Sequence, residues 1–161
     1  MPKIYNVEQL RTALQKPIER SIKQLGGIVN DYTKEMIKAI VYNPYIPSWD
    51  KRRKNKGGFL GSWVHEDFEF KTTIFSDADR MEEHEEGNKR NFIHGSEYYE
   101  PSDIRDRLGN YIIEGTSGYL FGTGFWTESR DFWSPTIQYV EKDILQTEIK
   151  NVFGKHGIIL V

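Results

Sequence analysis

Apolar side chains recur at helical spacing along the first quarter of the chain. Between residues 18 and 40 they lie three or four positions apart, at Ile18, Ile22, Leu25, Val29, Tyr32, Met36 and Ile40. A stripe with this period predicts a long amphipathic helix whose apolar face packs into a core. Gly26-Gly27 weakens the middle of the stripe. This pair either lets another backbone approach closely or marks a bend.

A helical turn is also predicted before the stripe. Asn6 is a favourable N-cap residue, and Gln9 occupies the capping-box position three residues later. Val7, Leu10 and Leu14 share one face of this turn. Pro17 either kinks the helix or is the first-turn residue of a second helix.

The pattern changes in the stretch from Tyr42 to Trp63. Pro44 and Pro47 bias the residues before them away from helix, so Asn43 and Ile46 are predicted to be extended and the helix to end near Tyr42. Five cations then fall within six residues: Lys51, Arg52, Arg53, Lys54 and Lys56. Because Gly57-Gly58 follows, the stretch is interpreted as a helix-to-sheet joint that carries a basic, glycine-ended loop.

Apolar and polar residues alternate after this joint. Val64, Phe68, Phe70, Thr72 and Ile74 alternate with polar side chains, which predicts one strand over 64–74 with a buried and a solvated face.

The next segments are interpreted by composition. Residues 76–91 are polar and charged, which favours a long projecting loop or the tip of an extended hairpin. Residues 92–94 are predicted to resume a strand, residues 96–107 to be irregular or a short helix from Ser102, and residues 108–113 to form another strand.

A second helical stripe lies near the end of the chain, at Ile137, Val140, Ile144, Ile149 and Val152. Ser134 is predicted to be its N-cap and Pro135 its first helical residue. Gly154 suits the C-terminal cap, and residues 157–161 are a candidate edge strand.

The order of these elements predicts a single α+β domain over residues 1–161. Its long N-terminal helix and its C-terminal helix pack on an antiparallel sheet that carries a long projecting loop or hairpin. The 161 residues suffice for one core. Aromatic residues make up 14 % of the chain, so many must be buried or lie at an interface.

Charge is segregated along the chain although the net charge is only −2. A candidate acidic inter-subunit loop follows the strand and contains Asp77, Asp79, Glu82, Glu83, Glu85 and Glu86. The acidic loop and the basic loop either bring copies together head to tail or are two solvated loops that never meet.

Motifs for catalysis or cofactor binding are not found in the sequence. The chain has no cysteine, its four histidines lack metal-ligand spacing, and it has neither a phosphate-binding loop nor a nucleophile elbow. We therefore predict no enzyme activity, no cofactor and no metal site, and no apolar run long enough to cross a membrane. Glu82–Glu86 as the site of a metal-dependent nuclease or other hydrolase is the least favoured alternative.

The basic loop supports a second interpretation. Lysine and arginine contact phosphates without sequence preference, and Trp49 and Phe59 on either side offer rings for base stacking. The alternative function is therefore a small nucleic-acid-binding protein that uses residues 51–56. A solvated loop, or one that faces an acidic partner, accounts for the run equally well.

A series of short motifs follows a recognisable order. The motifs are Tyr42-Asn-Pro-Tyr45, Arg52-Arg53, Gly57-Gly58-Phe59-Leu60, Tyr111-Ile-Ile-Glu114-Gly115-Thr116 and Arg130-Asp-Phe132-Trp-Ser-Pro135. This order resembles that of the phage neck or tail-completion proteins, a head–tail joining family of lambda-like siphophages. Asp131 stands where the family pattern has a proline, and the acidic segment 76–91 has no counterpart in it.

The resemblance implies a non-catalytic virion protein, made in the cytoplasm of the bacterial host and located at the neck. It implies a homo-oligomeric ring between the head and the tail that contacts other phage connector and tail proteins and leaves a channel for DNA. Lys51–Lys56 would then face the DNA or a partner. A structural role is implied for Glu114, Gly115, Thr116, Arg130, Phe132 and Pro135.

Overall fold

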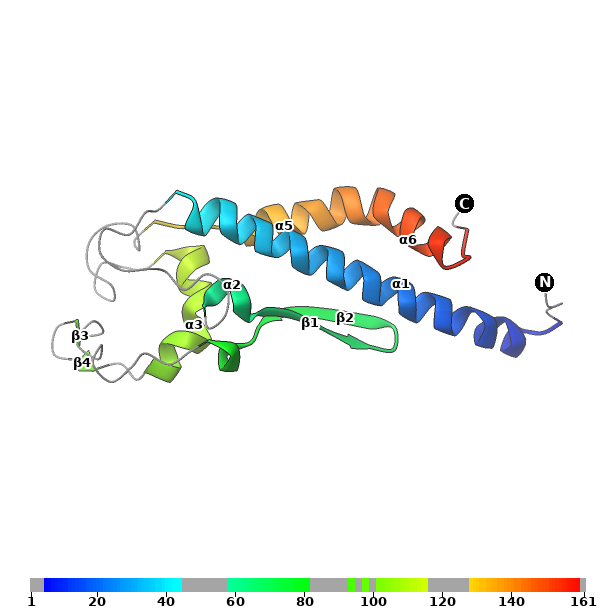
Figure 1. Cartoon of the computed structure of the whole chain (residues 1–161), viewed down its shortest axis with the longest axis horizontal. Helices are drawn as coiled ribbons and strands as arrows, with labels where there is room; N and C mark the ends of the chain where they lie inside the picture. The colour runs from blue at the N-terminus through cyan, green and yellow to red at the C-terminus, as the bar shows by residue number, and fades with distance from the viewer. Residues whose placement is uncertain are drawn as a thin grey trace. The chain divides into compact units, whose positions relative to one another are not determined.

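The computed structural model describes residues 5–44, 58–81, 93–94, 97–98, 101–115 and 128–159. These residues form an α+β fold that is mostly helical, as predicted, with small antiparallel strand pairs instead of an extensive sheet (Figure 1). The chain divides into two compact units. Unit 1 contains Met1–Tyr32, His65–Ile74 and Thr136–Val161, and unit 2 contains Thr33–Val64 and Phe75–Pro135.

Helix α1 (Val7–Met36) begins with the predicted cap. The Oδ1 atom of Asn6 accepts the backbone N–H of Gln9 at 2.9 Å, and the Gln9 side chain accepts the N–H of Tyr5 at 2.8 Å. Pro17 lies inside α1, so a second helix does not begin there. Proline has no backbone N–H, so Pro17 interrupts the hydrogen bonds of the helix. Next to this interruption, the Pro17 carbonyl accepts a hydrogen bond from the Ser21 hydroxyl at 2.9 Å.

Helix α1 continues into η1 (Ile37–Tyr42), a wider π-type turn. The helix ends at Tyr42 as predicted, but the prediction that Asn43 is extended is wrong. Asn43 has φ −68° and ψ −38°, because its N–H donates to the Lys38 carbonyl at 2.8 Å and holds it helical. Ile46 lies outside the described residues. The i→i+5 geometry puts Ile37 and Tyr42 on one buried face. The buried face of this part of the helix therefore differs from the predicted one, which contains Met36 and Ile40.

The single strand predicted over 64–74 is instead a hairpin. A short helix α2 (Phe59–Ser62) leads into β1 (Trp63–Phe68), which pairs with β2 (Lys71–Ser76) across a two-residue turn at Glu69-Phe70. The turn lacks the glycine or asparagine that usually marks a hairpin, so alternation runs through it unbroken. Phe68 and Phe70, which alternation places on a buried face, are 59 % and 49 % exposed.

The beginning of the predicted projecting loop is folded onto unit 2. Residues 78–80 form the 3₁₀ turn η2 (Ala78–Arg80), and Met81 after it is buried. The Asp77 N–H donates to the Ser62 carbonyl at 2.9 Å, and the hydroxyls of Ser62 and Ser76 lie 2.8 Å apart. Residues 82–91 lie outside the described part of the chain.

The remaining elements of unit 2 confirm one predicted strand and correct another. Strand β3 (Ile93–His94) pairs antiparallel with β4 (Glu97–Tyr98), so the strand expected near residues 92–94 is confirmed. The strand predicted over 108–113 is wrong, because α3 (Pro101–Glu114) is a continuous helix. Its apolar residues recur at helical spacing, Ile104, Leu108, Tyr111 and Ile112, and Pro101 fits a first helical position.

The C-terminal helix comprises α5 (Trp133–Tyr139), η4 (Val140–Glu148) and α6 (Ile149–Lys155). The predicted stripe has a gap of five residues between Ile144 and Ile149. The structure accommodates this gap because the Ile149 N–H donates to the Ile144 carbonyl, an i→i+5 bond that keeps both residues on one face. Ile144 and Val152 are buried.

The helix ends at Lys155, and the glycine of its C-terminal cap is Gly157 and not the predicted Gly154. Gly157 has φ +82°, and its N–H donates to the Gly154 carbonyl at 3.0 Å while the Ile158 N–H donates to the Phe153 carbonyl at 2.9 Å. This pair of bonds is a Schellman cap, which needs a left-handed residue one position beyond the cap. Residues 158–159 form no strand, and residues 160–161 lie outside the described part.

In unit 1 the C-terminal helix runs antiparallel to α1 (Figure 1). The rings of Tyr32 and Tyr139 stack with centroids 3.9 Å apart, and His156 Nε2 lies 3.2 Å from Gln24 Oε1. The hairpin also packs on α1. The side chain of Thr72 on β2 lies close to Gly26. A close approach at the glycine pair is therefore present, but a strand side chain makes it instead of the predicted backbone.

Candidate functional site

An aromatic cluster forms the core of unit 2. The rings of Phe59, Trp63 and Phe132 meet pairwise edge to face, with centroids 5.4 to 5.9 Å apart. Phe132 is fully buried, and Trp133 lies beside Trp63 with a centroid separation of 5.4 Å. Edge-to-face pairs add to the free energy gained from burial alone, so the cluster fixes α2 against residues 132–133.

The segment before Phe132 is held against the end of α3. The Arg130 N–H donates to the Ile112 carbonyl at 2.9 Å, and the Ser129 hydroxyl donates to the Ile113 carbonyl. Helix α3 ends at Glu114, and Gly115 after it has φ +78° and donates its N–H to the Tyr111 carbonyl at 3.1 Å. A left-handed residue is needed to turn the chain here, and glycine adopts that conformation at little cost.

Three of the stretches that carry the family resemblance therefore come together in unit 2. They are Gly58-Phe59-Leu60, Tyr111–Gly115 and Arg130–Pro135. Arg130 is only 5 % exposed and Pro135 is half-buried, whereas Glu114 is exposed. Thr116 and the whole basic loop, Lys51–Lys56, lie outside the described residues. We name the convergence of these three stretches the motif core.

Asp131 starts the C-terminal helix in place of the predicted Ser134. Its Oδ1 accepts the backbone N–H groups of Trp133 and Ser134, each at 2.9 Å, and its Oδ2 accepts the Ser134 hydroxyl. The Ser134 hydroxyl bond, then the Ser134 and Trp133 backbone bonds, hold the pKa of Asp131 below 3.8, although partial burial opposes the shift. Pro135 is then the third residue of the helix and not the first, still within the turn whose N–H groups need no intrahelical partner.

Removing this cap is expected to weaken the motif core. Asp131→Ala leaves two N–H groups without their acceptor and should lower the free energy of unfolding by about 1 kcal/mol near neutral pH. Asp131→Asn keeps a capping oxygen, so its loss at that pH should be smaller. Urea denaturation monitored by tryptophan fluorescence measures both values.

The same pair of variants tests the charge on the cap. Because the folded-state pKa is lowered, the carboxylate stabilises the folded chain above the ordinary value of 3.8, and this contribution is lost as the pH falls through the lowered pKa. The amide of the Asp131→Asn variant does not titrate. The advantage of the natural chain over this variant should therefore shrink as the pH is lowered from ~6 to ~3. An advantage that stays constant over this range would contradict the assignment.

Two of the six residues of the predicted acidic loop, Asp77 and Asp79, lie in the described part, and the Asp77 side chain has a local role. Asp77 accepts the Asp79 N–H at 3.1 Å and the Arg80 Nε at 3.0 Å, so it caps η2 and pairs with the one cation of that turn. Glu82, Glu83, Glu85 and Glu86 lie outside the described residues. Because the whole basic loop also lies outside the described residues, contact between the acidic and basic loops stays a prediction.

The described residues were also searched for ligand chemistry. Among them no group of three or more histidine, aspartate or glutamate side chains is placed to hold a metal ion. None of the helices in these ranges is both long enough and apolar enough to cross a membrane.

Sequence reasoning missed a set of exposed apolar side chains. In the described ranges, the large hydrophobic residues with high exposure all belong to unit 1, and they are Tyr5, Val7, Leu10, Phe68, Phe70, Ile137 and Ile159. The buried ones fall mostly in unit 2. Apolar residues at helix or strand spacing are normally assigned to a core, so the sequence pattern carries no signal that distinguishes these.

Comparisons of the chain with models of known families, with curated proteins and with solved structures found no match.

Proposed function

We propose that this protein is a structural component of a phage neck or tail-completion region, where copies form a ring that joins the DNA-filled head to the tail. The observation that supports this function most directly is the motif core. Stretches that are separate in the sequence, and that match the order of landmarks in the head–tail joining family, pack on one another around Phe59, Trp63 and Phe132.

The division of apolar surface supports the same function. Unit 2 encloses its large apolar residues in the described ranges, whereas unit 1 leaves many of its own in water. A monomer gains no stability from aromatic rings that stay exposed to water. A subunit that assembles with its neighbours can bury such rings at the contacts between subunits. The protein would then act through the surfaces that unit 1 offers to its neighbours.

The function is tested in the phage that encodes the protein. A nonsense mutation in the gene should give filled heads and separate tails in electron micrographs, and the chain supplied from a plasmid should restore joined particles. Mass spectrometry of purified particles should detect the protein. Joined infectious particles in the mutant, or particles that lack the protein, would sink the proposal.

The second candidate function, nucleic-acid binding, depends on the five cations of residues 51–56. Binding through phosphates predicts an affinity for DNA that falls steeply with salt and that is lost when these five residues are replaced by alanine. The two functions separate in the complementation assay. If the alanine variant still joins heads to tails, then DNA binding by this loop is not the essential function.

A further inference from the structure

We propose that unit 1 carries two complementary halves of a contact between copies. One half is the start of α1, where Tyr5, Val7 and Leu10 are exposed, and the other is the turn of the hairpin, where Phe68 and Phe70 are exposed. In the assembly, the α1 start of one copy binds the hairpin turn of the next. The choice of a second copy as the occupant rests on the proposed function, which requires a ring.

The exposure of these residues is high for their type. Tyr5 and Val7 are 77 % and 80 % exposed, and Phe68 is 59 % exposed at the end of its strand. Val7 and Leu10 lie three residues apart, so they share one face of the first turns of α1. Two clusters of apolar side chains on one unit, each left in water by its own chain, are typical of a surface that is covered on assembly.

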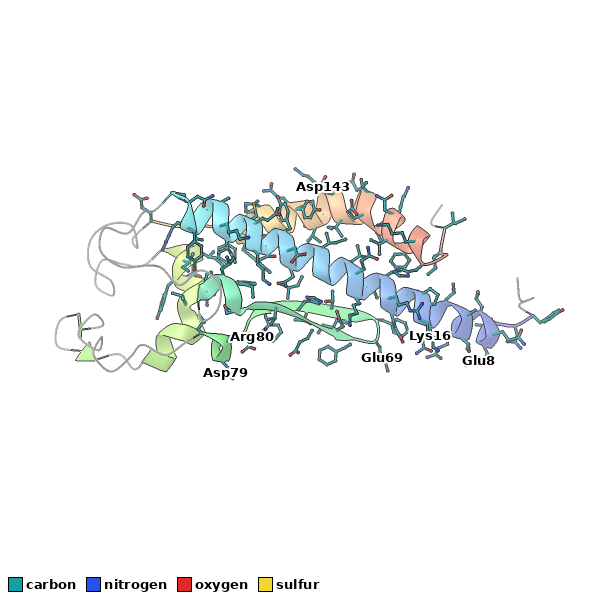
Figure 2. All side chains as sticks on the ribbon, in the orientation of Figure 1. Glu8, Lys16, Glu69, Asp79, Arg80 and Asp143 are labelled. Atoms are coloured by element: carbon teal, nitrogen blue, oxygen red, sulfur yellow. The ribbon has the colours of Figure 1, made fainter. Side chains whose placement is uncertain are left out.

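The hairpin carries an excess of negative charge, and the first half of α1 carries a small excess of positive charge. The hairpin carries the exposed carboxylates of Glu66, Asp67 and Glu69 against one lysine, Lys71. Asp67 already pairs with Lys23 at 3.8 Å, whereas Glu69 at the turn has no ion pair in the described ranges. The first half of α1 presents its cations in excess, with Arg11, Lys16 and Arg20 against Glu8 and Glu19. Figure 2 shows Glu69 at the hairpin turn and Lys16 on α1.

The two clusters are different surfaces of one chain, so the contact is heterologous. A heterologous contact leaves one free cluster of each kind after two copies have joined, and it closes into a ring when the rotation between copies permits. A contact between the same cluster on two copies would instead stop at a dimer. The proposed function needs the first behaviour.

Disulfide trapping tests this contact directly, because the natural chain has no cysteine. Glu8→Cys and Lys71→Cys place thiols at exposed positions beside the two clusters without removing an apolar side chain or a carboxylate of the hairpin. When the two purified variants, distinguished by a mass tag, are mixed and mildly oxidised, the mixed disulfide dimer should dominate over either homodimer. The matched control replaces Glu8→Cys by Asp143→Cys, a likewise exposed site on η4, and should give no enrichment.

A second pair of variants tests the apolar part of the contact. Adding Phe68→Ser and Phe70→Ser to Lys71→Cys should abolish the mixed disulfide. Adding Ile159→Ser, which removes an apolar side chain that is 86 % exposed elsewhere in unit 1, should leave it intact. Circular dichroism of each variant shows whether its helices are retained.

The outcomes separate this contact from the proposed function. A mixed disulfide no more abundant than the Asp143 control, or homodimers alone, overturns the contact, even if the protein is found at the neck. A strong mixed disulfide from a protein that is absent from particles supports the contact and overturns the neck function. A mixed disulfide that survives both serine substitutions overturns the assignment of Phe68 and Phe70.

Discussion

Replacing Phe132 by alanine is expected to destabilise unit 2 by about 3–5 kcal/mol. Phe132 is fully buried and its ring meets those of Phe59 and Trp63 edge to face, at 5.8 and 5.4 Å. Truncation leaves a cavity lined by rigid rings that cannot collapse into it, and it also removes two favourable ring contacts. A small protein is stable by only about 5–15 kcal/mol, so much of the motif core's stability should be lost.

Urea denaturation of dilute protein measures this effect, with the fluorescence of Trp63 and Trp133 as a signal from within the cluster. Phe68→Ala is the matched control, because the same side chain is removed from a position that is 59 % exposed. It should change the free energy of unfolding by no more than about 0.5 kcal/mol. If the two alanine variants unfold at similar urea concentrations, then the aromatic cluster is not the core of unit 2.

The two substitutions are expected to impair assembly for different reasons. Phe68→Ala should leave the chain folded and weaken the contact between copies, whereas Phe132→Ala should impair assembly only through loss of folded unit 2. Folding and self-association can therefore be distinguished with one residue type at two positions. The two expected results differ because Phe132 is buried and Phe68 is exposed, although the residue type is the same.

The helix ends show what local chemistry can predict. The start of α1 at Asn6 and the helix end at Tyr42 are both confirmed, because capping and proline effects act within a few residues. The start of the last helix is predicted three residues too late. Ser134 and Asp131 are both good caps, and nothing in the sequence shows that Asp131 accepts both N–H groups while Ser134 donates to it.

The errors in strand prediction have a different cause. Residues 108–113 are a short apolar run, and such a run does not distinguish a strand from the end of a helix. The helix α3 is hidden in the sequence because its first part, from Pro101, is charged and resembles an irregular segment. In the hairpin, alternation continues through Glu69-Phe70, so period alone cannot reveal where the chain turns back.

The candidate site is only partly visible in the sequence. The order of the landmark residues points to Arg130 and Phe132, and the structure buries both. Their convergence with Phe59 and Ile112 depends on how α2 and α3 pack, which no local pattern encodes. The exposed rings of Phe68 and Phe70 escape detection because hydrophobic periodicity predicts burial for both, whereas their own chain leaves them exposed.

Gly26→Ala is expected to destabilise unit 1 by roughly 1–2 kcal/mol, against the usual preference of helices for alanine. A Cβ at Gly26 would lie 2.9 Å from the Cβ of Thr72 and closer still to its Oγ1. The strand β2 must then move away from α1, and the cost of this overpacking exceeds the ~1 kcal/mol that alanine contributes in a helix.

The neighbouring glycine is the matched control for this prediction. Gly27 lies in the same helix with no atom within 4 Å of the added methyl group, so Gly27→Ala should stabilise the chain by ~0.5–1 kcal/mol. Thr72→Ala removes Oγ1 and Cγ2, and it should recover part of the loss when combined with Gly26→Ala. Chemical denaturation followed by circular dichroism gives all four values. Stabilisation by both glycine substitutions would contradict the packing of β2 on α1, since only that contact makes the two positions unequal.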